Sequence, residues 1–331
     1  MRLNMTDLVH IALAANHRYV KGLRATLVSM VAASREKARL RFHVFSDGLT
    51  DEDKSGLVTL ARRFGYAEPI DFREPDMKPI AERFSAYYGT HTAYVRLFFP
   101  ETLPELDWVL WADVDTLWFR DPAELWDLRE DRHSLLWCED LPSTKRFVRD
   151  WHVRFDAAFD SRPYCCSGVM MMNLAKMRRE NFVEKGLTLV ARHGTPPFAD
   201  QGVFNALCGE DAKVVDGSWD LLRPVSRIDR GVVLHFNGLG KQFDDATYTG
   251  WRPLYEVWFR YVAQVVEGRA GAQVWPLGKR LLSLMLGALS PLSPIVKCLP
   301  MRHWHRDNIR RTLFFAWLRG RQLWPQLGGH P

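Results

Sequence analysis

Short apolar runs alternate with longer amphipathic stretches along most of the chain. The apolar runs predict strands at residues 8–16, 41–46, 68–73, 108–112, 134–137, 167–173 and 231–235. Helical periodicity marks residues 19–34, a segment that begins after Thr50, and residues 79–99, 121–126, 174–193 and 201–208. Strands that alternate with helices in this way predict an α/β fold with a doubly wound, mostly parallel sheet of the Rossmann type.

The run from Trp108 to Ala112 has the composition of a buried strand, yet two carboxylates, Asp113 and Asp115, follow directly after it. In an extended chain residues i and i+2 point to the same side, so we expect both carboxylates on one face. Such a pair is costly to bury unless a cation lies between its members, and ligands bind at the carboxyl ends of parallel strands. The stretch therefore predicts a divalent metal site, and the alternative is a buried ion pair with an arginine.

A second D-x-D pattern, Asp51-Glu52-Asp53, has a different origin. It follows Thr50 at the start of a predicted helix, where a capping side chain and acidic residues stabilise the helix N-terminus. We therefore assign this pattern to capping and solubility rather than to metal binding.

His235 ends the last apolar run and begins the pattern His235-x-x-Gly238-x-x-Lys241. A neutral imidazole suits a borderline divalent ion such as Mn²⁺. A glycine lets the backbone approach a bound phosphate closely, and a lysine nearby can reach the same anion. Together with the paired aspartates, this spacing predicts a site for a metal-bound diphosphate.

The composition is that of a globular protein with one strongly basic end. Of 331 residues, 47% are apolar and 25% are charged, which allows a sizeable core. The net charge of +6 is uneven, because residues 279–331 carry nine basic residues and one acidic residue, which leaves −2 for residues 1–278. Arginines in this tail are interleaved with aromatic and aliphatic residues, which is typical of a segment that lies in a membrane interface. The alternative for the tail is a helical subdomain that docks on the body.

Four further observations bear on compartment and partners. Five cysteines include the adjacent pair Cys165-Cys166 and no C-x-x-C, so we expect a reducing compartment. The apolar segment Leu8–Ala15 contains His10 and fits a first strand better than a signal peptide. No apolar run reaches the ~18 residues of a membrane-spanning helix. No aromatic and basic recognition module lies outside the tail, so a nucleic-acid partner is not expected.

Four motifs in a fixed order resemble glycosyltransferase family 8, and most closely its bacterial lipopolysaccharide galactosyl- and glucosyltransferases. The motifs are Asp113-x-Asp115, Ser167-Gly-Val-Met-Met-Met-Asn-Leu174, Asp200-Gln201 and His235-x-x-Gly-x-x-Lys241. The resemblance implies a GT-A catalytic domain at residues 1–265, followed by a basic, amphipathic, helical tail at 266–331. It also implies a UDP-galactose or UDP-glucose donor, Mn²⁺ (with Mg²⁺ as a substitute), and transfer with retention of configuration. The implied acceptor is a glycan or glycolipid, such as a lipopolysaccharide core sugar, at the cytoplasmic face of the inner membrane.

The same resemblance assigns roles to individual residues. It makes Asp113, Asp115 and His235 the metal ligands, Gly238 and Lys241 the diphosphate contacts, Asn16 and Tyr19 neighbours of the uridine, Arg96 a residue that holds the donor, and Asp200 and Gln201 the residues that face the donor sugar. Two positions depart from the family pattern. The family has Phe-Asn-Ala-Gly where this chain has Cys165-Cys166-Ser167-Gly168, and acids where strand one ends in Asn16-His17.

No well-placed Asp or Glu nucleophile can be picked out from the sequence, so we expect retention by attack on the same face of the sugar that the leaving group departs from, with the amide oxygen of Gln201 stabilising charge at the anomeric carbon. A double displacement that uses Asp200 or Asp140 stays open. An aspartyl-nucleophile phosphatase also uses D-x-D after a buried strand, but it has Gly-Thr after the second Asp, where this chain has Thr116-Leu117. A non-enzymatic, membrane-associated sugar-binding protein is the other alternative, although it would not require a glycine and a lysine spaced from a ligand histidine.

Overall fold

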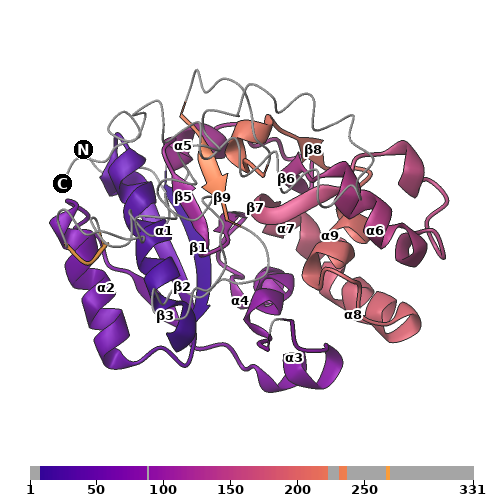
Figure 1. Ribbon diagram of the computed structural model, residues 1–331, viewed down its shortest axis with the longest axis horizontal. Helices are drawn as coiled ribbons and strands as arrows, with labels where there is room; N and C mark the ends of the chain where they lie inside the picture. The colour runs from indigo at the N-terminus through magenta and orange to yellow at the C-terminus, as the bar shows by residue number, and fades with distance from the viewer. Residues whose placement is uncertain (1–7, 88, 223–230, 237–265, 269–331) are drawn as a thin grey trace, which may run out of the picture.

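A computed structural model describes residues 8–87, 89–222, 231–236 and 266–268 of the chain (Figure 1). The helices are α1 Val20–Ala33, α2 Asp51–Arg63, α3 Lys78–Arg83, α4 Phe99–Thr102, α5 Pro122–Trp126, α6 Pro142–His152, α7 Leu174–Arg179, α8 Phe182–His193 and α9 Asp200–Cys208. The strands are β1 Val9–Asn16, β2 Leu40–Asp47, β3 Asp71–Arg73, β4 Trp108–Ala112, β5 Thr116–Trp118, β6 Leu135–Glu139, β7 Cys165–Asn173, β8 Lys213–Val214 and β9 Val233–His235. Short 3₁₀ turns cover His17–Tyr19, Lys37–Arg39, Thr92–Phe98, Phe159–Ser161 and Gly217–Trp219.

Seven strands form the central sheet in the order β3-β2-β1-β4-β7-β6-β8. Strands β3, β2, β1 and β4 pair in parallel, and so do β6 and β8, which confirms the predicted α/β, mostly parallel sheet. Strand β7 runs antiparallel to both of its neighbours, β4 and β6. The last predicted strand does not join this sheet, because β9 pairs with β5 in a separate two-stranded antiparallel ribbon.

Helices cover both faces of the sheet. Helices α1 and α2 pack on one face, where Leu23, Leu27 and Leu57 join its core cluster. The 3₁₀ turn at 92–98 and helices α4, α7, α8 and α9 pack on the other face in a second cluster. Because both faces are covered, the central strands are apolar throughout, and every residue of β4 is buried.

Three predicted elements are shorter or broken in the structure. The helix predicted at 79–99 ends at Arg83, because Phe84 adopts an extended conformation (φ −122°, ψ 139°). A tight turn follows, in which Tyr87 and Thr90 exchange backbone hydrogen bonds around Gly89, at φ +76°. The helix predicted at 174–193 is two helices, since Asn181 adopts a left-handed conformation between them. The strand predicted at 68–73 begins only at Asp71, after Pro69, which has no N–H to donate to a ladder.

The capping assignment of the second D-x-D pattern is confirmed at Asp53. The Thr50 side chain accepts a hydrogen bond from the backbone N–H of Asp53 at 3.1 Å, and the Asp53 carboxylate accepts one from the backbone N–H of Thr50 at 3.0 Å. This reciprocal capping box starts α2.

His152, at the end of α6, is a fully buried histidine that stacks on Phe159 with ring centroids 4.4 Å apart. Neither ring nitrogen has a hydrogen-bond partner among the described residues. Burial, together with the charge of Arg162, lowers the pKa of His152 to about 4, although Asp156 acts in the opposite direction. The imidazole is therefore neutral in the folded protein over the whole range in which a free histidine titrates.

Replacing His152 with Phe is expected to make the protein less sensitive to acid. The pKa of this group is lower in the folded state, so its contribution to stability is complete above pH 6.5 and is lost as the pH falls toward about 4. The loss is about 1.4 kcal/mol per pH unit, or up to about 2 kcal/mol at pH 5. Urea unfolding at pH 8 and pH 5 should show a smaller difference for His152→Phe than for the wild type. Equal differences in the two proteins would contradict this explanation.

Candidate active site

A cavity of about 110 Å³ lies at the carboxyl ends of β1 and β4, where a doubly wound sheet places its ligand site. It is lined by Ala14, Ala15, Asn16, Tyr19, Tyr87, Thr90, Thr92, Ala93, Arg96, Trp111, Asp113, Val114 and Asp115. The structure therefore brings five of the predicted site residues, Asn16, Tyr19, Arg96, Asp113 and Asp115, around one cavity.

The backbone turns sharply between the two aspartates. The carbonyl of Asp113 accepts hydrogen bonds from the backbone N–H and the hydroxyl of Thr116, at 3.2 and 2.8 Å. The expectation that strand alternation puts both carboxylates on one face is therefore wrong, because β4 ends at Ala112 and the chain is not extended at this point. The turn feeds Thr116 into the ribbon, in which Thr116 pairs with His235.

That ribbon explains how His235 reaches the aspartates although it lies more than a hundred residues away. The backbone N–H of Phe236 donates to the carbonyl of Asp115 at 3.0 Å. The Nε2 atom of His235 then lies 3.4 Å from Asp115 Oδ1 and 3.7 Å from Asp113 Oδ2. Asp115 and His235 are buried, whereas the Asp113 side chain is 25% exposed and borders the cavity.

Asp113, Asp115 and His235 have the donor set of a divalent metal site. One ligand atom from each lies within 4.8 Å of the others. Adjacent ligands of an octahedral ion with bonds of ~2.1 Å are about 3 Å apart, so a small contraction of this triad would enclose such an ion. Two carboxylates and one imidazole suit Mn²⁺ or Mg²⁺ better than a thiophilic metal.

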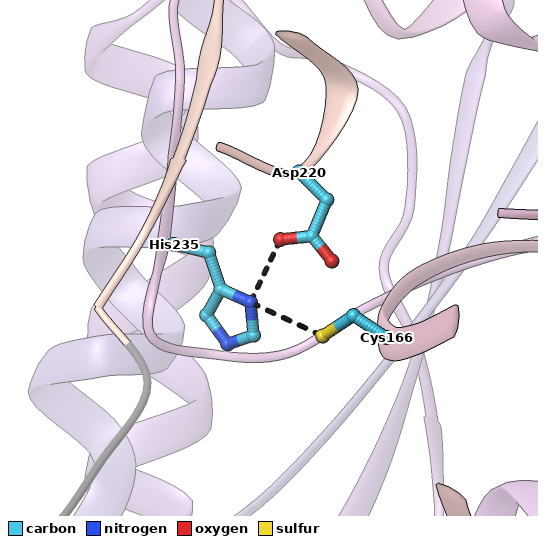
Figure 2. A group of neighbouring side chains, drawn as sticks. All are labelled: Cys166, Asp220 and His235. Carbon is cyan, nitrogen blue, oxygen red and sulfur yellow. Dashed lines mark hydrogen bonds and ion pairs between the residues drawn. The ribbon is translucent and has the colours of Figure 1, made fainter. Parts of the chain in front are cut away.

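On its Nδ1 side the imidazole of His235 faces Asp220 and Cys166, which come from two further segments (Figure 2). Asp220 Oδ1 lies 2.8 Å from His235 Nδ1, and Cys166 Sγ lies 3.8 Å from the same nitrogen. The ring also lies against Gly168, where an added Cβ would come within 2.2 Å of the imidazole Cε1 atom. Gly168 is thus required by the close approach of His235, which gives the Ser-Gly motif a structural reason.

Burial disfavours the charged form of His235, but Asp220 and Asp115 outweigh it and raise the pKa of His235 to about 10. A metal ligand must be a neutral imidazole, so metal binding at this site would release a proton.

Arg96 is the centre of a buried polar network beneath the cavity. Its side chain is 4% exposed, and it forms ion pairs with Asp200 at 2.5 Å and with Asp113 at 2.7 Å. It also donates to the Ser167 carbonyl at 2.8 Å and stacks on the ring of Trp111 at 4.6 Å. The two carboxylates outweigh burial and raise the pKa of Arg96, so the guanidinium is permanently charged.

For Asp113, the structure also contains the ion pair with an arginine that the sequence pattern left as the alternative to a metal site. Asp113 Oδ1 accepts hydrogen bonds from Arg96 and from Trp111 Nε1, while Asp113 Oδ2 faces His235. The arginine pair and the metal triad thus share Asp113 and do not exclude each other.

Asp200 and Gln201, at the start of α9, are buried below the cavity. The Gln201 amide oxygen accepts from the backbone N–H of Ser167 at 3.1 Å, and the amide nitrogen donates to Asp140 Oδ2 at 2.9 Å. Ala199, just before them, has φ +50° and ψ −129°, an unfavourable conformation for a residue with a Cβ. The structure thus connects both residues to the site through Arg96, Ser167 and Asp140.

The remaining predicted site residues and the tail are not covered in the same way. Gly238 and Lys241 lie outside the described residues, so the diphosphate contacts stay a prediction. Residues 237–265, which precede the predicted boundary at 265/266, and residues 269–331 also lie outside them. Among the cysteines, Cys138, Cys165, Cys166 and Cys208 are buried and free.

Asp220 is the residue of this site that the sequence did not reveal. It lies at the end of a 3₁₀ turn, outside every recognised motif, and 15 positions before its partner His235. A single acidic residue in a loop carries no periodicity or spacing signal, so only the folded structure could identify it.

Comparison with known proteins agrees with this geometry. The family model described as "Glycosyl transferase family 8" matches residues 10–245. The chain belongs to glycosyl transferase family 8. Membership of this family argues against an aspartyl-nucleophile phosphatase. Together with the fold, it supports a glycosyl-transfer function.

Individual similar proteins share limited sequence identity with this chain. General stress protein A of Bacillus subtilis (strain 168) is 24% identical over 61% of this chain and 69% of its own length. Glucoside xylosyltransferase 1 of Mus musculus is 32% identical, over 43% of this chain and 35% of that protein. Among solved structures, the galactosyltransferase LgtC in complex with donor and acceptor sugar analogues matches with a TM-score of 0.63. That match has 22% identity and covers 82% of this chain and 99% of LgtC, which confirms the GT-A fold.

Proposed function

We propose that this family 8 protein transfers galactose or glucose from a UDP-sugar to a saccharide acceptor, with retention of configuration and with Mn²⁺ at the Asp113, Asp115 and His235 triad. The observation that carries the proposal is the convergence of these three side chains at the edge of the cavity. A non-enzymatic sugar-binding protein would not need two carboxylates and an imidazole in this arrangement. Mg²⁺ is the expected substitute, because both ions accept oxygen ligands.

The cavity suits a nucleotide at the end of strand β1. Asn16 Nδ2 donates to Thr90 Oγ1 at 3.4 Å, which fixes the orientation of the amide. The buried Asn16 Oδ1 has no hydrogen-bond partner among the described residues, so it can accept a hydrogen bond from the imide N–H of uracil. Tyr19 lines the same cavity and offers a ring for the base or ribose to pack on.

A metal ion bound by the triad would supply the positive charge that stabilises the UDP leaving group. The protein residues do the rest of the work. Asp113 and Asp115 would hold that ion beside the cavity, and Arg96 fixes Asp113 in place through its 2.7 Å ion pair. Lys241 is proposed to add a second positive charge at the diphosphate.

For retention we propose same-face attack, with Gln201 as the residue that stabilises the developing charge at the anomeric carbon. Its amide oxygen accepts hydrogen bonds from the backbone N–H of Ser167 at 3.1 Å and from the Ser167 hydroxyl at 3.4 Å, so this hydroxyl must rotate away to free a lone pair for the interaction. A double displacement through Asp140 is the second route. Asp140 accepts hydrogen bonds from Leu141, Thr144 and Gln201, although burial raises its pKa. Asp200 fits the nucleophile role less well, because it is paired with Arg96.

The test is a donor screen in which hydrolysis without acceptor is the readout. UDP-galactose, UDP-glucose and UDP-xylose are incubated with protein and Mn²⁺, the xylose donor being included because of the xylosyltransferase relative. We expect slow release of UDP from one hexose donor, loss of the activity with EDTA, and recovery on adding back Mn²⁺. If the protein neither binds nor turns over any of the UDP-sugars, the proposal is contradicted.

We also propose that the acceptor is a lipopolysaccharide core sugar and that residues 266–331 hold the protein on the cytoplasmic face of the inner membrane. The support is the basic and aromatic composition of the tail. Within the described part of the chain, no helix is long and apolar enough to span a membrane.

Deletion of residues 270–331 is expected to release the protein from anionic vesicles. Each basic side chain near such a surface contributes about 1 kcal/mol, so the loss of nine of them should abolish measurable binding. Co-sedimentation with vesicles that contain 30% anionic lipid, at two salt concentrations, measures this; the lipid fraction is on the order of that in cytoplasmic leaflets. Binding that persists after deletion and resists salt would contradict the membrane role of the tail.

A further inference from the structure

The neighbourhood of His235 Nδ1 contains one acidic side chain whose burial needs a reason. Asp220 is 2% exposed as a residue, and its carboxylate is fully buried. Its Oδ1 atom lies 2.8 Å from His235 Nδ1, whereas its Oδ2 atom has no hydrogen-bond partner among the described residues. Burial of a carboxylate is costly unless it is paired, so the contact with His235 is the interaction that compensates for it.

The backbone around Asp220 fixes this contact. The N–H of Leu221 donates to the carbonyl of Val233 at 2.8 Å, which bridges Leu221 to the β9 strand two positions before His235. Trp219, on the other side of Asp220, is buried under the guanidinium of Arg120 at 3.6 Å. Asp220 is thus anchored on both sides, and its side chain cannot easily turn away from the imidazole.

The position of Asp220 relative to the metal triad is informative. It contacts Nδ1, whereas Asp113 and Asp115 face Nε2 on the opposite side of the same ring. Metal-binding histidines commonly donate their second N–H to a carboxylate, which fixes the tautomer and the ring orientation and strengthens the ligand. From this geometry we infer that Asp220 is a positioning residue for the metal site, which holds the proton on Nδ1 and presents Nε2 to the ion. The inference rests on the proposed function, because it assumes that His235 is a metal ligand.

A second metal site on the Nδ1 side is the competing explanation. Cys166, Asp220 and His235 together form a donor set that zinc accepts, with their ligand atoms within 4.8 Å of one another (Figure 2). Zinc ligands at bond lengths of ~2.05 Å are about 3.3 Å apart in a tetrahedron. The observed 2.8 Å between Nδ1 and Oδ1 is shorter and fits a hydrogen bond with a shared proton. The distances therefore favour positioning over a second ion.

The experiment measures Mn²⁺ binding directly, by electron paramagnetic resonance of free Mn²⁺, in the full-length protein. We expect Asp220→Ala to weaken the affinity for Mn²⁺ by about 10–100-fold. Asp220→Asn should weaken it less, because an amide oxygen can still accept from Nδ1–H. Cys166→Ser is the matched control on the same side of the ring, and its affinity for Mn²⁺ should stay within about twofold of the wild type. In Asp220→Asn, KM for the UDP-sugar at saturating Mn²⁺ should change little.

Each other outcome has a clear meaning. Affinity for Mn²⁺ that is unchanged in both Asp220 variants overturns the inference, as does an equal loss in Cys166→Ser together with tight Zn²⁺ binding by the wild type. If Asp220→Ala does not fold by circular dichroism, Asp220→Asn decides alone. A wild-type protein that binds no Mn²⁺ would instead count against the proposed function.

Discussion

An Asp115→Asn substitution is expected to lower metal-dependent hydrolysis of the sugar donor by about 10²–10³-fold while leaving the protein folded. The Asp115 side chain is 5% exposed and its Oδ1 atom lies 3.4 Å from His235 Nε2. Asparagine has nearly the same shape but carries no charge, so the triad would keep one carboxylate of the two. A loss of this size is typical when one preorganised electrostatic group is removed from an active site.

The second D-x-D pattern supplies a matched control for this substitution. Asp51 is exposed in the first turn of α2, and Asp51→Asn removes the same charge from the same sequence pattern. We expect its donor hydrolysis to equal that of the wild type. The measurement is UDP release at several Mn²⁺ concentrations, and higher Mn²⁺ should restore part of the activity of Asp115→Asn. Equal activity in Asp115→Asn and the wild type would show that Asp115 binds no metal needed for the reaction.

The sequence predicted the parts of the fold that depend on local pattern. The apolar run 108–112 is strand β4, and the cap at Thr50 starts α2. Burial of a strand on both faces and capping of a helix are determined by residues that are close in the chain, so a single sequence shows them. Periodicity did not reveal the left-handed conformation of Asn181, which divides the helix predicted at 174–193, or the extended conformation of Phe84, which ends α3, and it did not predict helix α6.

The sequence predicted which residues form the candidate metal site, but not the backbone pairing that brings them together. Asp113, Asp115 and His235 were identified from their places at the ends of apolar runs, and the structure brings all three together. The reason given for the two aspartates was wrong, because a turn and the pairing of β5 with β9 bring them to His235, not strand alternation. Pairing between segments that are distant in the chain depends on the whole fold, so the sequence pattern could not show it.

The contacts of Arg96 and Asp220 were beyond the sequence for the same reason. Arg96 meets Asp200 across 104 positions of the chain, and Asp220 meets His235 only because β9 folds back. Both ion pairs are buried in the structure. Each joins residues that are not neighbours in the chain, so their contact cannot be inferred from the sequence alone. They are also the contacts with the largest expected energetic effects.

Replacing Arg96 with Met is therefore expected to destabilise the protein by about 3–5 kcal/mol, the range for breaking a buried ion pair from one side. Methionine keeps much of the side-chain volume but leaves the buried carboxylate of Asp200 without its charged partner. Asp113 loses the same partner and would no longer be held in place beside His235, so Mn²⁺-dependent hydrolysis should also be lost. Urea unfolding at pH 7 measures the stability effect.

Two further variants separate charge from packing in this prediction. Arg73→Met removes an arginine that forms ion pairs with Asp71 and Glu105, both of them partly exposed, and it should cost no more than about 1 kcal/mol. Adding Asp200→Asn to Arg96→Met removes the unpaired buried charge, and it should restore part of the lost stability without restoring hydrolysis. If Arg96→Met costs no more than Arg73→Met, the network beneath the cavity does not stabilise the fold. Recovery of stability in the double variant would show that the destabilisation of Arg96→Met comes from the unpaired carboxylate of Asp200. The stability of α9 would then depend on the same arginine that holds Asp113 in the metal-binding turn.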